Sequence, residues 1–387
     1  MAGEVDRSRV EGLFVTRPIK VAHLTSAHPR DDVRIFRKMC VSLAKAGYET
    51  VLIVADGKGD DRVSGVTIID VGASRGRLDR ILRAPRRVLR AAKRSGASLF
   101  HLHDPELLPL TWELRSYGSV IFDSHEDVPK QMIGKPYLNP VLLRLLAWSV
   151  YAFEVVACRW LDAVIAATPS IRAKFERLSR RVIDINNFPM EGELETVSQQ
   201  NERQLEICYV GAIAEIRGVK ELCEALGEVK APVRLNLVGD LPPGSDLYRT
   251  LSSTAGWSRV NVLGYLDRTS VREVMGRSFA GIVTFHPLPN HVDAQPNKMF
   301  EYMSAGIPVI ASDFPLWRQI INGAGCGLLV DPLNPSSIAT AIDKLAGDPR
   351  LVTSMGDAGR IAVSSRYNWR SEEKRLLSFY QQLVPSN

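Results

Sequence analysis

The sequence lacks the features of a disulfide-stabilised or zinc-binding protein. Its 387 residues include five cysteines, which are scattered along the chain and form no C-x-x-C pair. An odd number of dispersed cysteines argues against a disulfide framework and a zinc knuckle, and it fits a reducing compartment. The first 17 residues are polar and charged, without the apolar core of a signal peptide. We therefore expect a cytoplasmic protein.

Long apolar runs are also scarce. The most apolar stretch, residues 141–157, is interrupted by Arg144 and Glu154 and is too short for a comfortable bilayer span. We expect it to form a buried helix. The hydrophobic content of 45% and charged content of 24% are ordinary for a globular chain of two or three domains.

Positive charge is concentrated in one segment. The formal net charge is +6, yet residues 75–94 alone carry nine cations against the single acid Asp79. The cations are Arg75, Arg77, Arg80, Arg83, Arg86, Arg87, Arg90, Lys93 and Arg94. Apolar residues recur among them at helical spacing, with Pro85 breaking or restarting the helix. This pattern is typical of a surface for anionic lipid, and a solvated basic face remains the alternative. Nucleic acid is disfavoured because few aromatic residues stand among the arginines.

Short β-rich runs alternate with helical patterns throughout the chain. A first series of expected strands comprises 19–24, 50–55, 66–71, 99–102, 120–123, 163–166 and 182–185, and a second comprises 206–210, 234–238, 260–263, 281–284, 308–311 and 327–330. Many of these runs are continuously apolar, as in strands buried on both faces. The alternation predicts parallel, doubly wound α/β sheets. Asp32, and the pairs Asp104-Pro105, Thr168-Pro169 and Asn334-Pro335, mark expected helix N-caps.

A polar stretch separates the two series of strands. We therefore expect a Rossmann-like N-terminal domain over 18–188, a linker over 189–204, a second Rossmann-like domain over 205–368 and a C-terminal helix over 369–387. Ligands of open α/β sheets bind beyond the carboxyl ends of the strands. Two such domains facing each other would place the active site in a cleft between them.

The strongest candidate site is the segment DAQPNKMFEYMSAGIP, which begins at Asp293. A strand leads into a loop, and Pro296 opens a helix whose N-terminus suits a diphosphate. Lys298 in the first turn adds positive charge, and Glu301 one turn later offers a carboxylate to ribose hydroxyls. An ordinary amphipathic helix with Glu301 on its wet face is the alternative.

A second candidate follows the first strand of the C-terminal domain. Gly211 at the strand end lets the backbone approach a ligand closely. Arg217, followed by Gly218 at the start of a helix, could clamp a phosphate. A turn glycine with a solvated arginine explains the same pattern.

The N-terminal domain offers polar residues at strand ends. His103 and His125 each end an expected strand, and His28, Arg30 and Arg34 follow the first strand, as acceptor-side candidates. The simplest role for Asp104 is an N-cap, and Asp123, Glu126 and Asp127 suggest a solvated loop. Histidines beside acids raise the idea of a metal site, but a tight ligand spacing such as H-x-x-x-H is missing, so we expect none.

Together these motifs resemble the family 4 retaining glycosyltransferases, which have the GT-B fold. The resemblance runs from about Ile19 to the C-terminus and is most specific in PNKMFEYMSAGIPVIASDFPLW and YVGAIAEIRGVKEL. It implies two Rossmann-like domains facing a cleft, with the C-terminal helix returning to the N-terminal domain. It also implies a nucleotide-diphosphate-sugar donor, a glycan or lipid-linked acceptor, retention at the anomeric carbon, and no metal or cofactor.

The resemblance assigns roles to particular residues. The family's E-x7-E motif falls on Asp293, one methylene shorter, and Glu301, which would hold the donor ribose. His125 would lie near the hydroxymethyl side of the donor sugar, and His103 near the cleft. The implied donor-binding set is Gly211, Arg217, Gly218, Pro296, Asn297, Lys298 and Glu301, and the implied catalytic set is His125, Asp293, Arg217 and Lys298.

The sequence also departs from the family. Ala212 stands where the family has a phosphate-binding arginine, and Arg217-Gly218 replaces a Lys-Gly pair, so Lys298 would compensate. TSAHPRDD replaces the usual glycine-rich turn after the first strand. A nucleotide-sugar epimerase or phosphorylase, and a non-enzymatic nucleotide-sugar-binding subunit, remain alternatives. For a transferase we expect the cytosol, at the inner face of a membrane.

Overall fold

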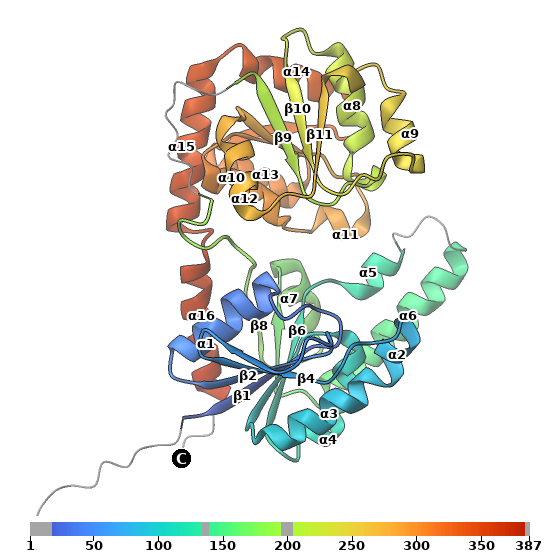
Figure 1. The fold of residues 1–387 in the computed structure, drawn as a ribbon, viewed down its shortest axis with the longest axis vertical. Coiled ribbons are helices and arrows are strands. Elements are labelled where there is room, and N and C mark those ends of the chain that lie inside the picture. The colour runs from blue at the N-terminus through green and yellow to red at the C-terminus, as the bar shows by residue number, and fades with distance from the viewer. Residues whose placement is uncertain (1–17, 134–138, 195–203, 384–387) are drawn as a thin grey trace, which may run out of the picture. The chain divides into compact units, whose positions relative to one another are not determined.

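The computed structural model describes residues 18–133, 139–194 and 204–383. The chain divides after Ile121 into two compact units. Its strands form two sheets, of eight and six strands, and helices connect them (Figure 1). The predicted linker falls largely on residues 195–203, outside the described residues, and the predicted domain limits stay a prediction.

The first sheet has the strand order β3-β4-β2-β1-β5-β6-β7-β8. Its strands are β1 (Lys20–Leu24), β2 (Glu49–Val54), β3 (Asp61–Val63), β4 (Val66–Asp70), β5 (Leu99–Leu102), β6 (Ser119–Ser124), β7 (Ala163–Ala166) and β8 (Val182–Asp184). β1 pairs in parallel with β2 and β5, and β7 with β8, whereas β3 is antiparallel to β4. The polar strand β3 was not predicted, because it lacks an apolar run.

The second sheet is wholly parallel, with the order β11-β10-β9-β12-β13-β14. Its strands are β9 (Glu206–Val210), β10 (Arg234–Val238), β11 (Val260–Gly264), β12 (Ala280–Val283), β13 (Val309–Ser312) and β14 (Gly327–Val330). Separate apolar clusters cover its two faces, which explains the continuous apolar runs of its central strands. The prediction of two doubly wound sheets is confirmed.

Helices link the strands. Up to β8 they are η1 (Val33–Cys40, π-helical), α1 (Val41–Lys45), α2 (Arg77–Leu82), α3 (Ala84–Ser95), η2 (Pro105–Leu110), α4 (Thr111–Leu114), α5 (Val128–Ile133), α6 (Pro140–Cys158) and α7 (Pro169–Phe175). After β9 they are η3 (Glu215–Arg217), α8 (Val219–Glu228), α9 (Asp246–Ser252), η4 (Trp257–Arg259), α10 (Arg268–Arg277), α11 (Pro289–Val292), α12 (Asn297–Ala305), α13 (Pro315–Ala324), α14 (Pro335–Ala346), α15 (Pro349–Ser365) and α16 (Trp369–Leu383).

Three of the predicted N-caps are confirmed and one is wrong. The side chains of Asp32, Thr168 and Asn334 accept hydrogen bonds from backbone N–H groups in the first turn that follows each. Asp104 occupies the cap position of η2, but its carboxylate makes no capping bond. It binds the loop after β1 instead, because several N–H and hydroxyl donors converge there.

The last helix, α16, packs on the end of β8. Glu372 accepts a hydrogen bond of 2.7 Å from the backbone N–H of Asn186, and Arg375 lies 2.8 Å from Asp184. Burial alone would raise the pKa of Asp184, but the ion pairs with Arg375 and Arg172 hold it below its usual value. These contacts confirm that the C-terminal helix returns to the sheet of the N-terminal domain.

The expectation of a buried helix over residues 141–157 is wrong. The stretch forms most of α6, but only 28% of the window Val141–Cys158 is buried. Among the described residues this helix alone is long and apolar enough to cross a membrane by length and composition. An apolar run without periodicity predicts a helix, but it does not say which of its faces are covered.

Candidate donor-binding site

The site is built where β9 ends. The backbone N–H of Val210 donates to the Tyr302 hydroxyl of α12 over 2.9 Å, which fastens this helix to the strand end. The Tyr209 hydroxyl donates to the carbonyl of Ala212 over 2.8 Å and fixes the loop that follows. Between them Gly211 adopts a φ of +115°, which favours glycine.

The bare backbone of Gly211 faces Lys298. A Cβ atom at Gly211 would lie 3.5 Å from Cε and 3.6 Å from Nζ of that lysine. The predicted strand-end glycine and the predicted helix-N-terminal lysine therefore meet, although they are far apart in the sequence. A side chain at position 211 would lie in van der Waals contact with the Lys298 side chain and would have to adopt a φ that strongly favours glycine.

Lys298 carries a buried amino group. The residue is 6% exposed, and its Nζ has no hydrogen-bond partner among the described residues. It lies 3.5 Å from the centroid of the Tyr209 ring, a cation–π contact. Burial, reinforced by the nearby charge of Arg217, lowers the pKa of Lys298 well below its usual value. An anion bound beside the ammonium would relieve this cost.

Arg217 supplies a second cation. Its guanidinium carbon lies 5.0 Å from the centroid of the Phe285 ring, and its positive charge helps to lower the pKa of Lys298. Gly218, which follows it with a φ of +71°, packs so closely on β12 that a Cβ would lie 1.8 Å from the Thr284 carbonyl oxygen. Because a residue with a side chain would clash in this turn, Gly218 determines where η3 ends and therefore the position of Arg217.

The N-terminus of α12 adds positive potential to the same place. Pro296 occupies the N-cap position and makes no side-chain capping bond, and the next residue, Asn297, is exposed. The first N–H groups of a helix have no intrahelical acceptor and suit a phosphate. The prediction that Pro296 opens a helix is confirmed.

Glu301 lies one turn further along α12 and is held by Arg268. One carboxylate oxygen accepts a bond of 2.9 Å from Nη1 of Arg268, and the same guanidinium donates to Glu193 over 3.0 Å. A carboxylate has room for further donors, so this pairing orients Glu301 and leaves it able to accept hydroxyl bonds.

The remaining predicted catalytic residues also have partners. Asp293 accepts a bond of 2.8 Å from Lys130. Nε2 of His125 lies 3.1 Å from the carboxylate of Asp123, which is fully buried. The alternative of a solvated loop does not hold for Asp123, because this residue belongs to β6 and its carboxylate is buried and orients the imidazole. Asp127 likewise pairs with Lys174 at 3.0 Å.

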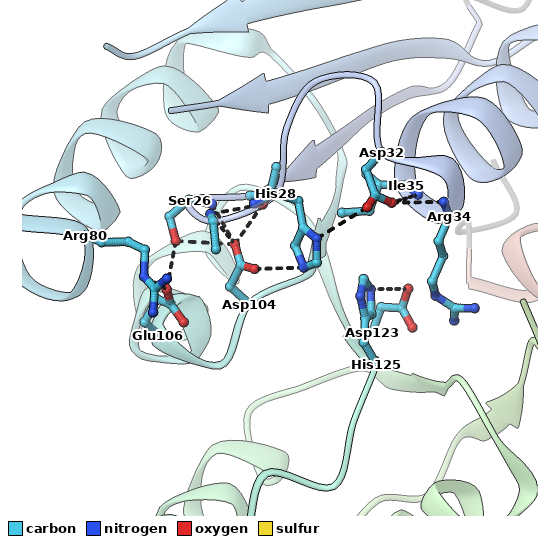
Figure 2. A network of polar contacts seen from close by, with 12 residues as sticks. Ser26, His28, Asp32, Arg34, Ile35, Arg80, Asp104, Glu106, Asp123 and His125 are labelled. Atoms are coloured by element: carbon cyan, nitrogen blue, oxygen red, sulfur yellow. Dashed lines mark hydrogen bonds and ion pairs between the residues drawn. The ribbon is translucent and has the colours of Figure 1, made fainter. Parts of the chain in front are cut away.

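Asp104 organises the loop after β1 (Figure 2). Its carboxylate accepts bonds of 2.8 Å from the Thr25 hydroxyl and 2.6 Å from the Ser26 N–H, and Nε2 of His28 lies 3.4 Å from it. The other ring nitrogen of His28 lies 3.4 Å from Asp32. The TSAHPRDD loop is therefore fixed by acidic side chains rather than by glycines.

The other acceptor-side candidates are engaged within the fold. Arg30 forms an ion pair with Asp56 at 2.8 Å, and Arg34 is buried. His103 is buried too, with Nε2 at 2.9 Å from Nδ1 of His23. The acceptor roles of these residues stay a prediction.

Three buried imidazoles were not foreseen as a group. His23 and His101 are register partners on β1 and β5, and His103 lies two residues further along, on the same face. One ring nitrogen from each lies within 4.8 Å of the others, which is a donor set able to hold a metal ion. The H-x-H spacing in β5 was the available signal, and the expected absence of a metal stays a prediction.

Sequence reasoning missed the residues that support the predicted ones. Phe285, Arg268 and Lys130 belong to no motif, and Tyr209 begins one without a role of its own; the site residues that they contact lie far away in the sequence. Tyr209 was the easiest of them to predict, because a strand residue two positions before Gly211 lies on the same sheet face as the glycine.

Comparison with known protein families identifies the class. Residues 33–185 match the model of the glycosyl transferase 4-like domain, and residues 204–348 match that of glycosyl transferases group 1. Together the two models cover well over half of the chain. The chain therefore belongs to the group 1 glycosyltransferases of the GT4 type.

Particular relatives share this class. Alpha-D-kanosaminyltransferase of Streptomyces kanamyceticus is 23% identical over 180 residues, 46% of this chain and 45% of that protein. The MMP alpha-(1->4)-mannosyltransferase of Mycolicibacterium hassiacum is 20% identical over 181 residues, 46% of this chain and 43% of that protein. The chain thus aligns with about half the length of these curated relatives.

Solved structures show the same fold. Sucrose-phosphate synthase from Thermosynechococcus elongatus superposes with a TM-score of 0.76 at 19% identity, covering 94% of this chain and 99% of that one. HepE of Anabaena, solved with UDP and glucose, superposes with a TM-score of 0.72 at 15% identity, covering 94% and 100%. At these identities the likeness defines the fold alone.

Replacing Lys298 tests whether its charge serves a ligand. We predict that Lys298→Met raises the unfolding midpoint of the ligand-free protein by about 2–4 °C, because it removes a buried polar group that has no hydrogen-bond acceptor among the described residues. The same change should abolish stabilisation by nucleoside diphosphates, as measured by thermal shift. Lys220→Met is a matched control, because Lys220 is only partly buried on α8 and lies beside Glu224, so its replacement should alter neither quantity. An undiminished ligand shift in Lys298→Met would contradict the assignment.

Proposed function

We propose that the chain is a retaining glycosyltransferase that moves a sugar from a nucleotide-diphosphate sugar to a glycan or lipid-linked acceptor. The observation that carries the proposal is the buried ammonium of Lys298, which faces Gly211 beside Arg217 and the open N-terminus of α12. Membership of the family and the glycosyltransferases among the relatives support it.

The proposed chemistry follows from charge. The bond between the anomeric carbon and the diphosphate oxygen breaks, and negative charge develops on the leaving diphosphate. Arg217, Lys298 and the first N–H groups of α12 stabilise that charge. The acceptor oxygen attacks from the same face and passes its proton to a diphosphate oxygen, so the products are the glycoside with retained configuration and the nucleoside diphosphate.

The other site residues have supporting roles in this proposal. Glu301, oriented by Arg268, accepts hydrogen bonds from the ribose hydroxyls. His125, oriented by Asp123, and Asp293 contact the donor sugar. His28, Arg30, Arg34 and His103 lie on the acceptor side. Two cations and a helix terminus provide the positive charge, so the proposed reaction needs neither a metal ion nor a cofactor.

Glu301 provides a direct test of donor binding. We predict that Glu301→Ala lowers the affinity for nucleoside diphosphates by about ten- to a hundredfold, which corresponds to the loss of charge-assisted bonds of roughly 1.5–3 kcal/mol. A thermal-shift screen of nucleoside diphosphates and their sugars would measure it and name the base. Glu193→Ala is the matched control, since it removes the other carboxylate partner of Arg268 and should keep the shift.

Product analysis then separates transfer from the alternatives. Transfer predicts a glycoside that forms only when an acceptor is added, and resistance of the rate to chelators. Isomerised donor without acceptor would favour an epimerase. Donor binding without turnover would favour a binding subunit, for which Ala212 is the sequence feature. No shift with any nucleotide would contradict the donor site itself.

We also propose that residues 75–94 bind an anionic membrane surface at the cytoplasmic face. None of the side chains of α2 is buried, and its exposed residues include Leu78, Leu82 and Arg77. Next to it Arg75, Arg83 and Arg87, with the single acid Asp79, line a cavity of about 320 Å³. An excess of positive charge around a cavity suits a phosphate headgroup.

Charge reversal tests this membrane surface. We predict that replacing Arg83, Arg86, Arg87 and Arg90 with Glu abolishes salt-sensitive binding to anionic vesicles in a flotation assay. The matched control reverses four exposed arginines elsewhere, Arg249, Arg272, Arg318 and Arg370, and should retain binding. Unchanged binding by the first variant would refute the role of the segment.

A further inference from the structure

Helix α6 exposes a broad apolar face. Eight of its large apolar side chains are between 40% and 69% exposed: Val141, Leu142, Leu145, Leu146, Trp148, Tyr151, Phe153 and Val156. Soluble proteins seldom leave a continuous apolar surface of this kind uncovered, and such surfaces mark contacts with membranes or other proteins.

Only a narrow strip of α6 holds it to the fold. Leu143, Ala147, Ala157 and Cys158 are buried, at spacings that place them on one side of the helix. On the same side the buried carboxylate of Glu154 pairs with Lys174 of α7 at 2.6 Å. The single acid of the helix is therefore neutralised against the protein, and it does not interrupt the exposed face.

The topology excludes a membrane crossing by α6. The helix follows β6 and leads into β7, and these two strands are neighbours in one sheet. A helix that crossed a bilayer once would leave β6 and β7 on opposite sides of it. A helix that keeps its buried strip on the protein and its apolar face outward has to lie along the surface.

We propose that the exposed face of α6 lies in the interfacial region of an anionic phospholipid bilayer, as a monotopic anchor. Trp148 and Tyr151 are aromatic residues of the kind that lie at membrane interfaces. Over Val141–Cys158 the one exposed charged residue is Arg144, and exposed Arg159 follows the helix. One arginine near each end of an apolar face complements an anionic bilayer, and long arginine side chains can reach the headgroups.

This anchor goes beyond glycosyl transfer and does not depend on it. It also differs in kind from the arginine surface of residues 75–94. Binding through arginines weakens in salt, whereas insertion of an apolar face does not. In a single vesicle assay, binding that persists at high salt therefore reports on α6, and binding that is lost at high salt reports on residues 75–94.

The test uses the full chain and vesicles of phosphatidylglycerol and phosphatidylcholine in a flotation assay at high salt. The proposal predicts that Leu145→Glu with Trp148→Glu lowers the salt-resistant bound fraction by about tenfold or more, because two inserted side chains become charged. The matched control, Leu333→Glu with Ile361→Glu, changes two exposed apolar residues outside α6 and should bind like the unmodified chain.

Further measurements distinguish the loss of a membrane anchor from other effects of the substitutions. The α6 variant should keep its unfolding midpoint and its nucleoside-diphosphate thermal shift, which separates a lost anchor from a lost fold or a lost donor site. Equal vesicle binding by the α6 variant and the unmodified chain would overturn the proposal. So would a dimer in analytical ultracentrifugation that disappears in the variant while neither protein binds vesicles, because a second copy would then cover the face.

Discussion

The candidate donor site depends on one energetically costly arrangement, the burial of the Lys298 amino group against the Tyr209 ring without a hydrogen-bond acceptor among the described residues. Burial and the neighbouring Arg217 lower the pKa of this lysine, so the ligand-free protein bears the cost of the charge or gives up a proton. Gly211 keeps the space in front of the ammonium open. The arrangement makes physical sense if an anionic ligand completes it, and the diphosphate of a nucleotide sugar has the required charge.

The parallel sheet explains how these groups come together. The carboxyl ends of β9 and β12 lie at one edge, so the loops that leave them place Gly211, Arg217 and the start of α12 in the same neighbourhood. Gly218 fits only because it has no side chain against β12, and Tyr302 ties α12 to the end of β9. Ala212 removes one cation from the pattern of the family, and Lys298 and Arg217 are the cations that remain.

The sequence predicted the sheets well because their strands are continuous apolar runs, and it predicted the opening of α12 from Pro296. The predictions failed where the role of a residue depends on which groups surround it in the folded chain. Asp104 has the sequence context of a cap, but the N–H groups after β1 compete successfully for its carboxylate. The apolar run of α6 was expected to be core, yet most of its residues are not buried, and those that are lie on one side of the helix. The aromatic partner of Lys298 and the arginine that orients Glu301 could not be predicted, since both contacts are made in three dimensions.

Isothermal titration calorimetry of UDP and the other nucleoside diphosphates, in buffers of different ionisation enthalpy, tests the central claim most directly. Near pH 8 the terminal phosphate, with a pKa of about 6, is already ionised. A lysine whose pKa is lowered in the free protein and restored by the anion takes up a proton on binding at any pH between the two pKa values, so the titrations are repeated from pH 8 upwards. The account predicts proton uptake that disappears in Lys298→Met. Binding with no proton uptake, or with the same uptake in the variant, would contradict it.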